Sequence, residues 1–314
     1  MILTVTPNAN LDKTYCVEDF ALDRVHRPTR AFTVAGGKGI NVARVYQTLG
    51  GVAIATGFLG GANGRIMAKA LQAEHITNEC VAVRGESRVC IAIVDPIHGT
   101  QTEVNERGPE ISRRNLRALE RKIETLLSQH TFKCVILDGS LPPGVPASYY
   151  AELIERIKPT GVPVVLDTSG EALRIGVQAR PWLVKPNRVE LEAILGRPLR
   201  DDADMLQTGR ELCNSGIPLV SMTRGSEGAY LLTPSEGWEA VPPKIDFASA
   251  VASGDSFLAA FLWQYFQGRP HSDLAQSLRL ATGAGAANAA VIGAGFCTRE
   301  ALFALAERAV LRKL

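Results

Sequence analysis

The stretch Val162-Pro163-Val164-Val165-Leu166-Asp167 is a nearly unbroken run of apolar residues that ends in a carboxylate. Continuous apolar strands of this kind suit a parallel sheet that helices cover on both faces. We therefore expect residues 162–167 to form a buried strand of an α/β fold, with Asp167 at its carboxyl end.

Strand-like and helical segments alternate on both sides of this stretch. The expected strands cover residues 2–5, 52–58, 134–138, 162–167, 182–185 and 218–223. The expected helices cover about residues 40–49, 63–74, 112–128, 146–157, 188–195 and 201–214. This pattern predicts a doubly wound, mostly parallel sheet with helices on both faces. Because α/β folds of this length often form one unit, we expect a single α/β domain over residues 1–314.

Two segments interrupt the alternation, residues 12–34 and 86–107. Both are extended runs of mixed polarity without helical spacing, and His98-Gly99 is typical of a hairpin turn. We predict that they form a small separate β-sheet, inserted into the domain as a lid. The alternative is a pair of ordinary edge hairpins.

Composition excludes several classes of protein. Hydrophobic residues make up 46% of the chain and charged residues 21%, which is ordinary for a globular protein. A net charge of +2 gives no reason to expect nucleic acid or a membrane as a partner. The six cysteines contain no C-x-x-C pair, so we expect reduced, buried thiols in a cytoplasmic protein. Residues 1–5 favour a first strand over a signal peptide, and residues 280–298 favour a close-packed buried helix over a membrane span.

In doubly wound sheets ligands bind at the carboxyl ends of the strands. Those ends carry polar residues here: Asp138-Gly139-Ser140, Asp167, Lys185-Pro186-Asn187 and Thr223-Arg224-Gly225. We expect the functional site at this edge of the sheet.

A further helix is expected to begin near Gly254, because apolar residues recur at helical spacing from Phe257 to Tyr265. Small residues precede it, and Asp255 falls in its first turn. The first N–H groups of a helix have no intrahelical partner, and the helix dipole adds positive charge there. This predicts a phosphate site with a carboxylate beside it, although an ordinary N-terminal acid would give the same local pattern.

Two other motifs fit the same chemistry. One is Gly36-Gly37-Lys38-Gly39-Ile40-Asn41, which precedes a helix. Its glycines let a ligand approach the backbone closely, and Lys38 and Asn41 supply a cation and an amide. The motif is not a Walker A loop. Asn187 and Glu190, three residues apart at a helix start, suit a hydrated Mg²⁺ ion or, alternatively, a simple helix cap. Arg224 to Gly228 is typical of a turn between two strands, and no dinucleotide fingerprint is present.

Together these motifs resemble those of the PfkB (ribokinase-like) carbohydrate kinases along the full chain. They are Asp12 in Asn8-Ala9-Asn10-Leu11-Asp12, Gly36 to Asn41, Gly139-Ser140-Leu141-Pro142, Lys185-Pro186-Asn187-x-x-Glu190, Gly225, and Ala252-Ser253-Gly254-Asp255. Within the family, the chain is most similar to the phosphosugar branch that contains 1-phosphofructokinase and tagatose-6-phosphate kinase. That likeness lies in Gly85-Glu86-Ser87-Arg88, Thr102-Glu103 with Gly108-Pro109, and Trp182 to Asn187.

The resemblance implies an enzyme that uses ATP and Mg²⁺ to phosphorylate a ketohexose phosphate, with a lid that often doubles as a homodimer interface. It implies Asp255 as the base and Ala252, Ser253 and Gly254, with Asp255, as an anion hole. It implies contacts to the sugar from Asp12, Gly37, Lys38, Asn41 and Ser140, and a contact from Arg88 to its phosphate. It also implies that Asn187 and Glu190 organise Mg²⁺, and that the nucleotide lies along Lys185, Asn187, Thr223, Gly225 and Gly228.

Two residues depart from the pattern of this branch. Ala252 replaces a usual glycine, and Asp138 replaces a common serine and brings a negative charge near the sugar. Two alternatives stay open: a kinase of an unphosphorylated sugar or nucleoside, and a catalytically silent sugar-phosphate sensor. The sequence also does not choose between fructose 1-phosphate, tagatose 6-phosphate and fructose 6-phosphate, because the same cations could bind any of them.

Overall fold

A computed structural model describes residues 1–267 and 273–314. Its main sheet has the strand order β15-β14-β13-β12-β11-β10-β9-β1-β4-β5, with β6 also beside β4. The parallel part comprises β1 (Ile2–Thr6), β4 (Ala53–Gly60), β5 (Thr77–Asn78), β6 (Val81–Val83), β9 (Val135–Asp138), β10 (Val164–Asp167), β11 (Leu183–Val184) and β12 (Leu219–Thr223). The antiparallel edge comprises β13 (Ala229–Leu232), β14 (Gly237–Val241) and β15 (Val310–Lys313).

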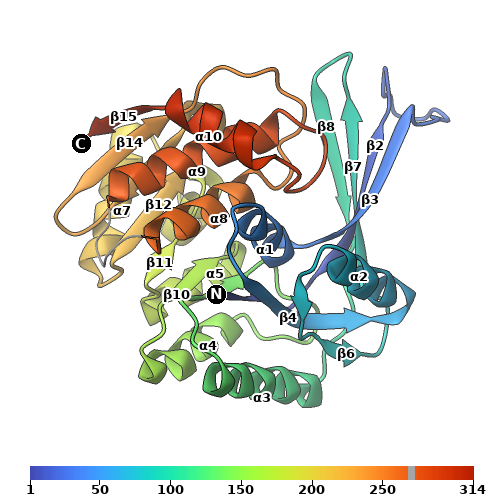
Figure 1. The fold of residues 1–314 in the computed structure, drawn as a ribbon, viewed down its shortest axis with the longest axis horizontal. Coiled ribbons are helices and arrows are strands. Elements are labelled where there is room, and N and C mark those ends of the chain that lie inside the picture. Colours follow the sequence, from blue (N-terminus) through green and yellow to red (C-terminus); the bar gives the residue numbers. More distant parts are fainter. Residues whose placement is uncertain (268–272) are drawn as a thin grey trace.

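Helices cover both faces of this sheet (Figure 1). One face carries α1 (Lys38–Thr48), α2 (Gly61–Ala73), α8 (Ser253–Tyr265), α9 (Leu274–Ala289) and α10 (Arg299–Glu307). The other carries α3 (Arg113–Gln129), α4 (Tyr149–Ile157), α5 (Gly170–Gly176), α6 (Arg188–Leu195) and α7 (Asp202–Asn214). Val165 of β10 packs into the first core, whereas Val164 and Leu166 pack into the second. A strand buried on both faces needs apolar residues at every position, which confirms the predicted fold.

The predicted strands and helices are all present, with ends shifted by a few residues. The buried helix expected over residues 280–298 is wrong at its end, because α9 stops at Ala289. Gly293 and Gly295 follow with φ values of 123° and 77°, which a continuing helix excludes. Within the described parts of the chain, no helix has both the length and the apolar character needed to cross a bilayer.

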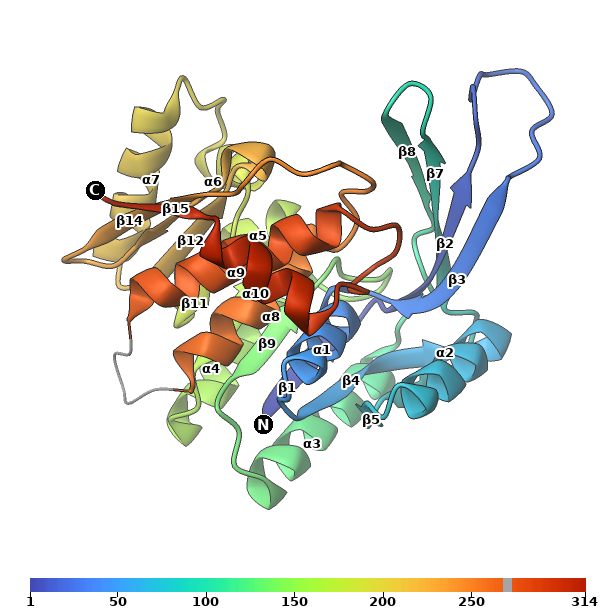
Figure 2. The same ribbon diagram turned by 45° about the horizontal axis from the view of Figure 1, so that its top comes forward.

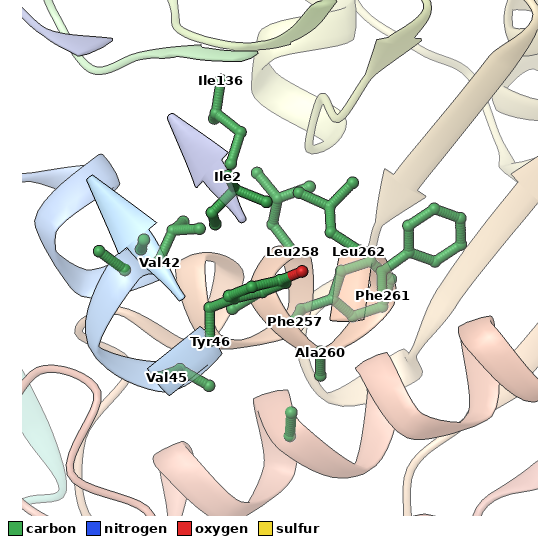
Figure 3. Packing of buried hydrophobic residues seen from close by; sticks show 14 of the residues in the cluster. Ile2, Val42, Val45, Tyr46, Ile136, Phe257, Leu258, Ala260, Phe261 and Leu262 are labelled. Atoms are coloured by element: carbon green, nitrogen blue, oxygen red, sulfur yellow. The ribbon is translucent and has the colours of Figure 1, made fainter. Parts of the chain in front are cut away.

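Helix α8 lies in the middle of the first core (Figure 3). Its buried face, including Phe257, Leu258 and Phe261, packs with Val42 and Tyr46 of α1. On its other side it packs against α9, whose buried residues are mostly alanine and glycine. A Cβ atom on Gly283 of α9 would lie 2.4 Å from the backbone nitrogen of Ala306 in α10, so these helices pack backbone to backbone.

Four strands form a second, smaller sheet in the order β3-β2-β7-β8. They are β2 (Asn10–Cys16), β3 (Arg30–Gly36), β7 (Arg88–Asp95) and β8 (Thr100–Asn105). The strands project from the main body beside α1 and α2 (Figure 2). The small sheet thus forms from the two segments that the sequence analysis singled out, and β7 and β8 form a hairpin with its turn at residues 96–99.

Ala252, which precedes α8, adopts a left-handed backbone conformation with φ 60° and ψ 11°. An L-residue pays about 1–2 kcal/mol in this region, and glycine pays almost nothing. Glycine, which the sequence resemblance leads one to expect at this position, would adopt this conformation without that cost. The backbone path at the start of α8 is kept here at the cost of local strain.

Ala252→Gly should therefore raise the free energy of unfolding by about 1 kcal/mol, since relief of strain exceeds the entropy that glycine adds to the unfolded chain. Urea denaturation monitored by circular dichroism would measure it. The control is Ala250→Gly at an exposed residue without positive φ, which should lower stability by about 0.4–1 kcal/mol. Equal effects at both positions would contradict the strain argument.

Candidate active site

A cavity of about 1310 Å³ opens at the carboxyl ends of the parallel strands, between the small sheet and the start of α8. Single-ligand sites usually measure about 300–1,000 Å³, so this cavity has room for two substrates. The sixteen residues that the sequence analysis assigned to the site all line it. They are Asp12, Gly37, Lys38, Asn41, Arg88, Ser140, Lys185, Asn187, Glu190, Thr223, Gly225, Gly228, Ala252, Ser253, Gly254 and Asp255.

The start of α8 faces the cavity without a side-chain cap. Ala252 at the N-cap has no side-chain acceptor, and Ser253 receives a hydrogen bond from Asn288 instead of capping the helix. A Cβ atom on Gly254 would lie 3.4 Å from Lys185 Nζ, so this ammonium group faces the first turn. Ser253 N donates to Ala250 O, which leaves the N–H groups of Gly254 and Asp255, the helix dipole and a lysine to form a site for an anion.

Asp167 at the end of β10 binds two lysines. Its Oδ1 accepts a hydrogen bond from Lys38 Nζ at 2.6 Å, and its Oδ2 lies 3.2 Å from Lys185 Nζ. Burial alone would raise the pKa of Asp167, but the two ammonium groups outweigh it and hold that pKa below its ordinary value. The strand pattern in the sequence predicts Asp167 at this edge but indicates no role for it. Only the fold brings it between the two lysines.

Asp255 is buried in the first turn of α8, and its Oδ2 accepts a hydrogen bond of 2.9 Å from Asn41 Nδ2. Burial raises the pKa of this carboxyl group, while Lys38 opposes the rise. The group is therefore held among a cation, an amide and the cavity, which suits a carboxylate that accepts a proton.

The start of α1 differs from that of α8 because a side chain already occupies it. Asp138 lies beneath it, fully buried, and its Oδ1 accepts hydrogen bonds from Gly39 N at 2.7 Å and from Thr6 Oγ1 at 2.9 Å. Burial raises the pKa of Asp138 well above its ordinary value. Asp138 does not line the cavity. The carboxyl group that the sequence suggested near the sugar therefore accepts a hydrogen bond from the start of α1 instead.

Asn187 and Glu190 form a reciprocal cap at the start of α6. Asn187 Oδ1 accepts from Glu190 N at 2.9 Å, and Glu190 Oε2 accepts from Asn187 N at 2.8 Å. Glu190 Oε1 lies 3.8 Å from Lys38 Nζ, at the cavity. Within residues 1–267 and 273–314, no three His, Cys, Asp or Glu side chains are placed to hold a metal ion together. A hydrated Mg²⁺ held by one carboxylate and by phosphates fits this arrangement, whereas an ion caged by protein alone does not.

The small sheet supplies the opposite wall of the cavity. Arg88 donates from Nε to Asn8 O at 3.1 Å and from Nη1 to Glu106 O at 3.4 Å, which leaves other N–H groups of its guanidinium for a ligand. Asp12 accepts from Asn10 Nδ2, and burial raises its pKa to about 6. This wall is also lined by Cys90, Glu103 and Asn105, to which the sequence motifs assign no role. The one sequence signal for their position is that they alternate along β7 and β8 and so share a face of the sheet with Arg88.

The far end of the cavity lies beyond β12. Thr223 ends that strand, and Gly225 has open space where a Cβ atom would be. A Cβ atom on Gly228 would lie 2.0 Å from Ala240 O, so glycine is needed there for packing. The loop after β14 adds Pro242 to Ile245 and the exposed Phe247 to the lining. This end is open and partly apolar, as a flat ring system requires.

The family model described as pfkB family carbohydrate kinase matches residues 5–301. The chain belongs to the pfkB family of carbohydrate kinases. It is 37% identical over 314 residues to a 1-phosphofructokinase from Rhodobacter capsulatus, which covers 100% of this chain and 98% of that protein.

Two solved structures of this fold are similar over nearly the whole chain. One is phosphofructokinase-2 from Escherichia coli in complex with substrates and products, with a TM-score of 0.90, 28% identity and 98% of each chain covered. The other is a possible 1-phosphofructokinase from Thermotoga maritima, with a TM-score of 0.90, 26% identity, and 100% of this chain and 99% of that one covered. The resemblance to pfkB-family kinases that the sequence motifs indicated is confirmed.

Proposed function

We propose that this pfkB-family kinase transfers the γ-phosphoryl group of ATP to a hydroxyl group of a ketohexose phosphate, with Asp255 as the base. The observation that carries the proposal is the uncapped start of α8, which lines the cavity with Asp255 in its first turn and Lys185 Nζ beside Gly254. Among ketohexose phosphates we favour fructose 1-phosphate, since the relative from Rhodobacter capsulatus carries the name 1-phosphofructokinase.

Phosphoryl transfer asks a protein mainly to position two substrates and to neutralise charge. The first N–H groups of α8 and Lys185 are oriented to meet the transferred group, and Asp255 is oriented to take the proton of the attacking hydroxyl. ATP is proposed to lie along Lys185, Asn187, Thr223, Gly225 and Gly228.

The sugar is proposed to bind between the start of α1 and the small sheet. Asp12, Gly37, Asn41 and Ser140 would contact it, and Arg88 would meet its phosphate. The sequence resemblance implies a contact from Lys38 to the sugar as well. Its ammonium group is engaged by Asp167 and lies near Glu190, which favours a place between the two substrates over one at the sugar phosphate.

A Mg²⁺ ion is proposed at Glu190, next to the phosphates of ATP. When bound, such an ion neutralises phosphate charge. Asn187 orients Glu190 through the reciprocal cap, and its Oδ1 accepts one hydrogen bond there, from Glu190 N. We also propose a cytoplasmic location, because the six cysteines are unpaired and four are buried.

Asp255→Asn should fold and bind ATP but lose about 10²–10⁴ in kcat, the usual contribution of a general base. Steady-state turnover with ATP and fructose 1-phosphate would measure it. Asp204→Asn, at a buried carboxylate outside the cavity that pairs with Arg197, is the control and should keep kcat near the wild-type value. Full kcat in Asp255→Asn would remove Asp255 from the proposed mechanism.

Arg88→Ala should lower kcat/KM for the sugar phosphate about 10- to 150-fold and leave the KM for ATP nearly unchanged. The reason is that charge-assisted hydrogen bonds are worth about 1.5–3 kcal/mol, at about 1.4 kcal/mol per decade. The assay compares fructose, its two monophosphates and tagatose 6-phosphate. Arg84→Ala, at an exposed arginine outside the cavity, is the control.

Two results would contradict the assignment of a sugar phosphate as the substrate. The enzyme could use free fructose as readily as its phosphates, or Arg88→Ala could discriminate between fructose and its phosphates as well as the wild type does. The kinase would then act on an unphosphorylated sugar or nucleoside. Binding of sugar phosphates without any turnover of ATP would identify a sensor.

We further propose that the small sheet is a lid on the single α/β domain and joins two copies into a homodimer. Ser249, beside the start of α8, already donates to Gln101 of β8 at 3.2 Å. Four large apolar side chains are exposed on the sheet and its loops: Leu22, Val25, Ile97 and Val104.

Hydrogen exchange in residues 12–34 and 86–107 should slow when the sugar phosphate binds, because a closed lid excludes water that would compete for the phosphoryl group. The exposed loop at residues 234–236 serves as an internal reference that should not change. Light scattering on the same sample should give the mass of a dimer. Unchanged exchange in both segments would exclude a lid, and a monomeric mass would exclude the homodimer.

A further inference from the structure

Arg44 of α1 is a buried cation that does not line the cavity. Only 6% of the residue is exposed, and its guanidinium group binds four separate parts of the chain. Nε and Nη2 donate to the carboxylate of Glu74 after α2, at 2.7 and 3.2 Å. Nη2 also donates to Ala35 O in β3 at 2.6 Å, and Nη1 donates to Ala294 O at 2.8 Å and to Asn41 Oδ1 at 2.9 Å. The bond to Asn41 points toward the site.

The bond from Arg44 decides which way the amide of Asn41 faces. A guanidinium group only donates hydrogen bonds, so the amide oxygen of Asn41 must face Arg44. The amide nitrogen is then left facing Asp255, and Nδ2 donates to Asp255 Oδ2 at 2.9 Å. An ionised carboxylate only accepts, so this is the one assignment that satisfies all three groups. A flipped amide would set its oxygen against the carboxylate.

We propose that Arg44 is a positioning residue for phosphoryl transfer, which holds Asp255 through Asn41. The inference rests on the proposed role of Asp255. Arg44 Nη2 also donates to Ala35 O, near the end of β3 and just before α1 begins. The guanidinium group of Arg44 therefore connects this end of the small sheet to the Asn41 amide that orients Asp255.

The competing explanation is that Arg44 only stabilises packing through its ion pair with Glu74. Two substitutions separate these roles. Arg44→Lys keeps a charge for Glu74 but loses the planar fork, and Arg44→Gln removes the charge and permits either orientation of Asn41. Glu74→Gln is the matched control, because it breaks the ion pair and leaves the bond between Arg44 and Asn41 in place.

Both Arg44 variants should lower kcat about 10- to 100-fold with smaller changes in either KM, since displacement of a reacting group by about 1 Å can cost 10²-fold. Glu74→Gln should lower the melting temperature and keep kcat near the wild-type value. In the double-mutant cycle with Asn41→Ala, Arg44→Lys should have little further effect, because both changes remove the same constraint.

The pH profile gives a readout that a purely structural role would not move. A hydrogen bond donated to the ionised carboxylate favours that form, so its loss raises the pKa of Asp255. The acid limb of kcat should therefore move to higher pH in Arg44→Lys, which keeps the positive charge, and in Asn41→Ala, but not in Glu74→Gln. The other groups whose charges act on Asp255 stay in place in these variants: Lys38 of α1, Asp167, Lys185, Asp138, Asp12 of β2 and, beyond Lys38, Glu190.

Three results would each overturn the inference. The effects of Arg44→Lys and Asn41→Ala on kcat could be additive, the acid limb of kcat could stay in place in these variants, or Glu74→Gln could lose as much kcat as the Arg44 variants. Full kcat in Asp255→Asn would instead overturn the proposed base, so the two failures are distinct. If either Arg44 variant does not fold, the cycle and the pH profile are measured on the other.

Discussion

The carboxylate of Asp167, held between Lys38 and Lys185, is the interaction on which the site depends. Asp167 and Lys185 are buried, and a buried charge is costly unless its partner is in place, whereas Lys38 reaches Asp167 from a partly exposed position. Lys38 comes from the start of α1, and Lys185 follows β11. The three groups therefore fix two separate segments against the end of β10. The cavity is correctly shaped only when the parallel sheet has formed around them.

The parallel sheet brings two helix starts, those of α1 and α8, to the same edge. The chain treats them differently. Asp138 accepts from the first turn of α1 inside the protein, whereas the first turn of α8 has no side-chain acceptor. One positive helix end is thus satisfied internally and the other is left for a ligand. Asn41, on α1, spans the gap between the two helices through its bond to Asp255.

The sequence predicted the fold well because its signals are local. Apolar strands, helical spacing and glycine-rich turns act over a few residues, and they placed Asp167, Lys185 and Thr223 at the correct edge of the sheet. The error at residues 290–298 has a local cause too. A stretch rich in alanine and glycine has the composition of a packed helix, but α9 ends at Ala289, and the positive φ of Gly293 and Gly295 beyond it excludes a helix there.

The partners within the site could not be predicted, because they come from distant parts of the chain. Lys38 and Asp167 are 129 residues apart, and Asn41 and Asp255 are 214 apart. The sequence offered Asn187 and Glu190 both as metal ligands and as a helix cap. The structure contains the cap, and Glu190 Oε1 remains directed at Lys38.

The small side chains of α9 carry a consequence for how the protein can diverge. Helix α8 packs on α9, and α9 packs backbone to backbone on α10 at Gly283, so the tight contact lies one helix behind the helix that holds Asp255. A methyl group added at Gly283 would meet the backbone nitrogen of Ala306 at 2.4 Å, so α9 would have to move away from α10 and press on α8. Homologous chains with identical cavity linings can therefore differ in activity through residues that no substrate touches. Two such chains need not have the same catalytic rate.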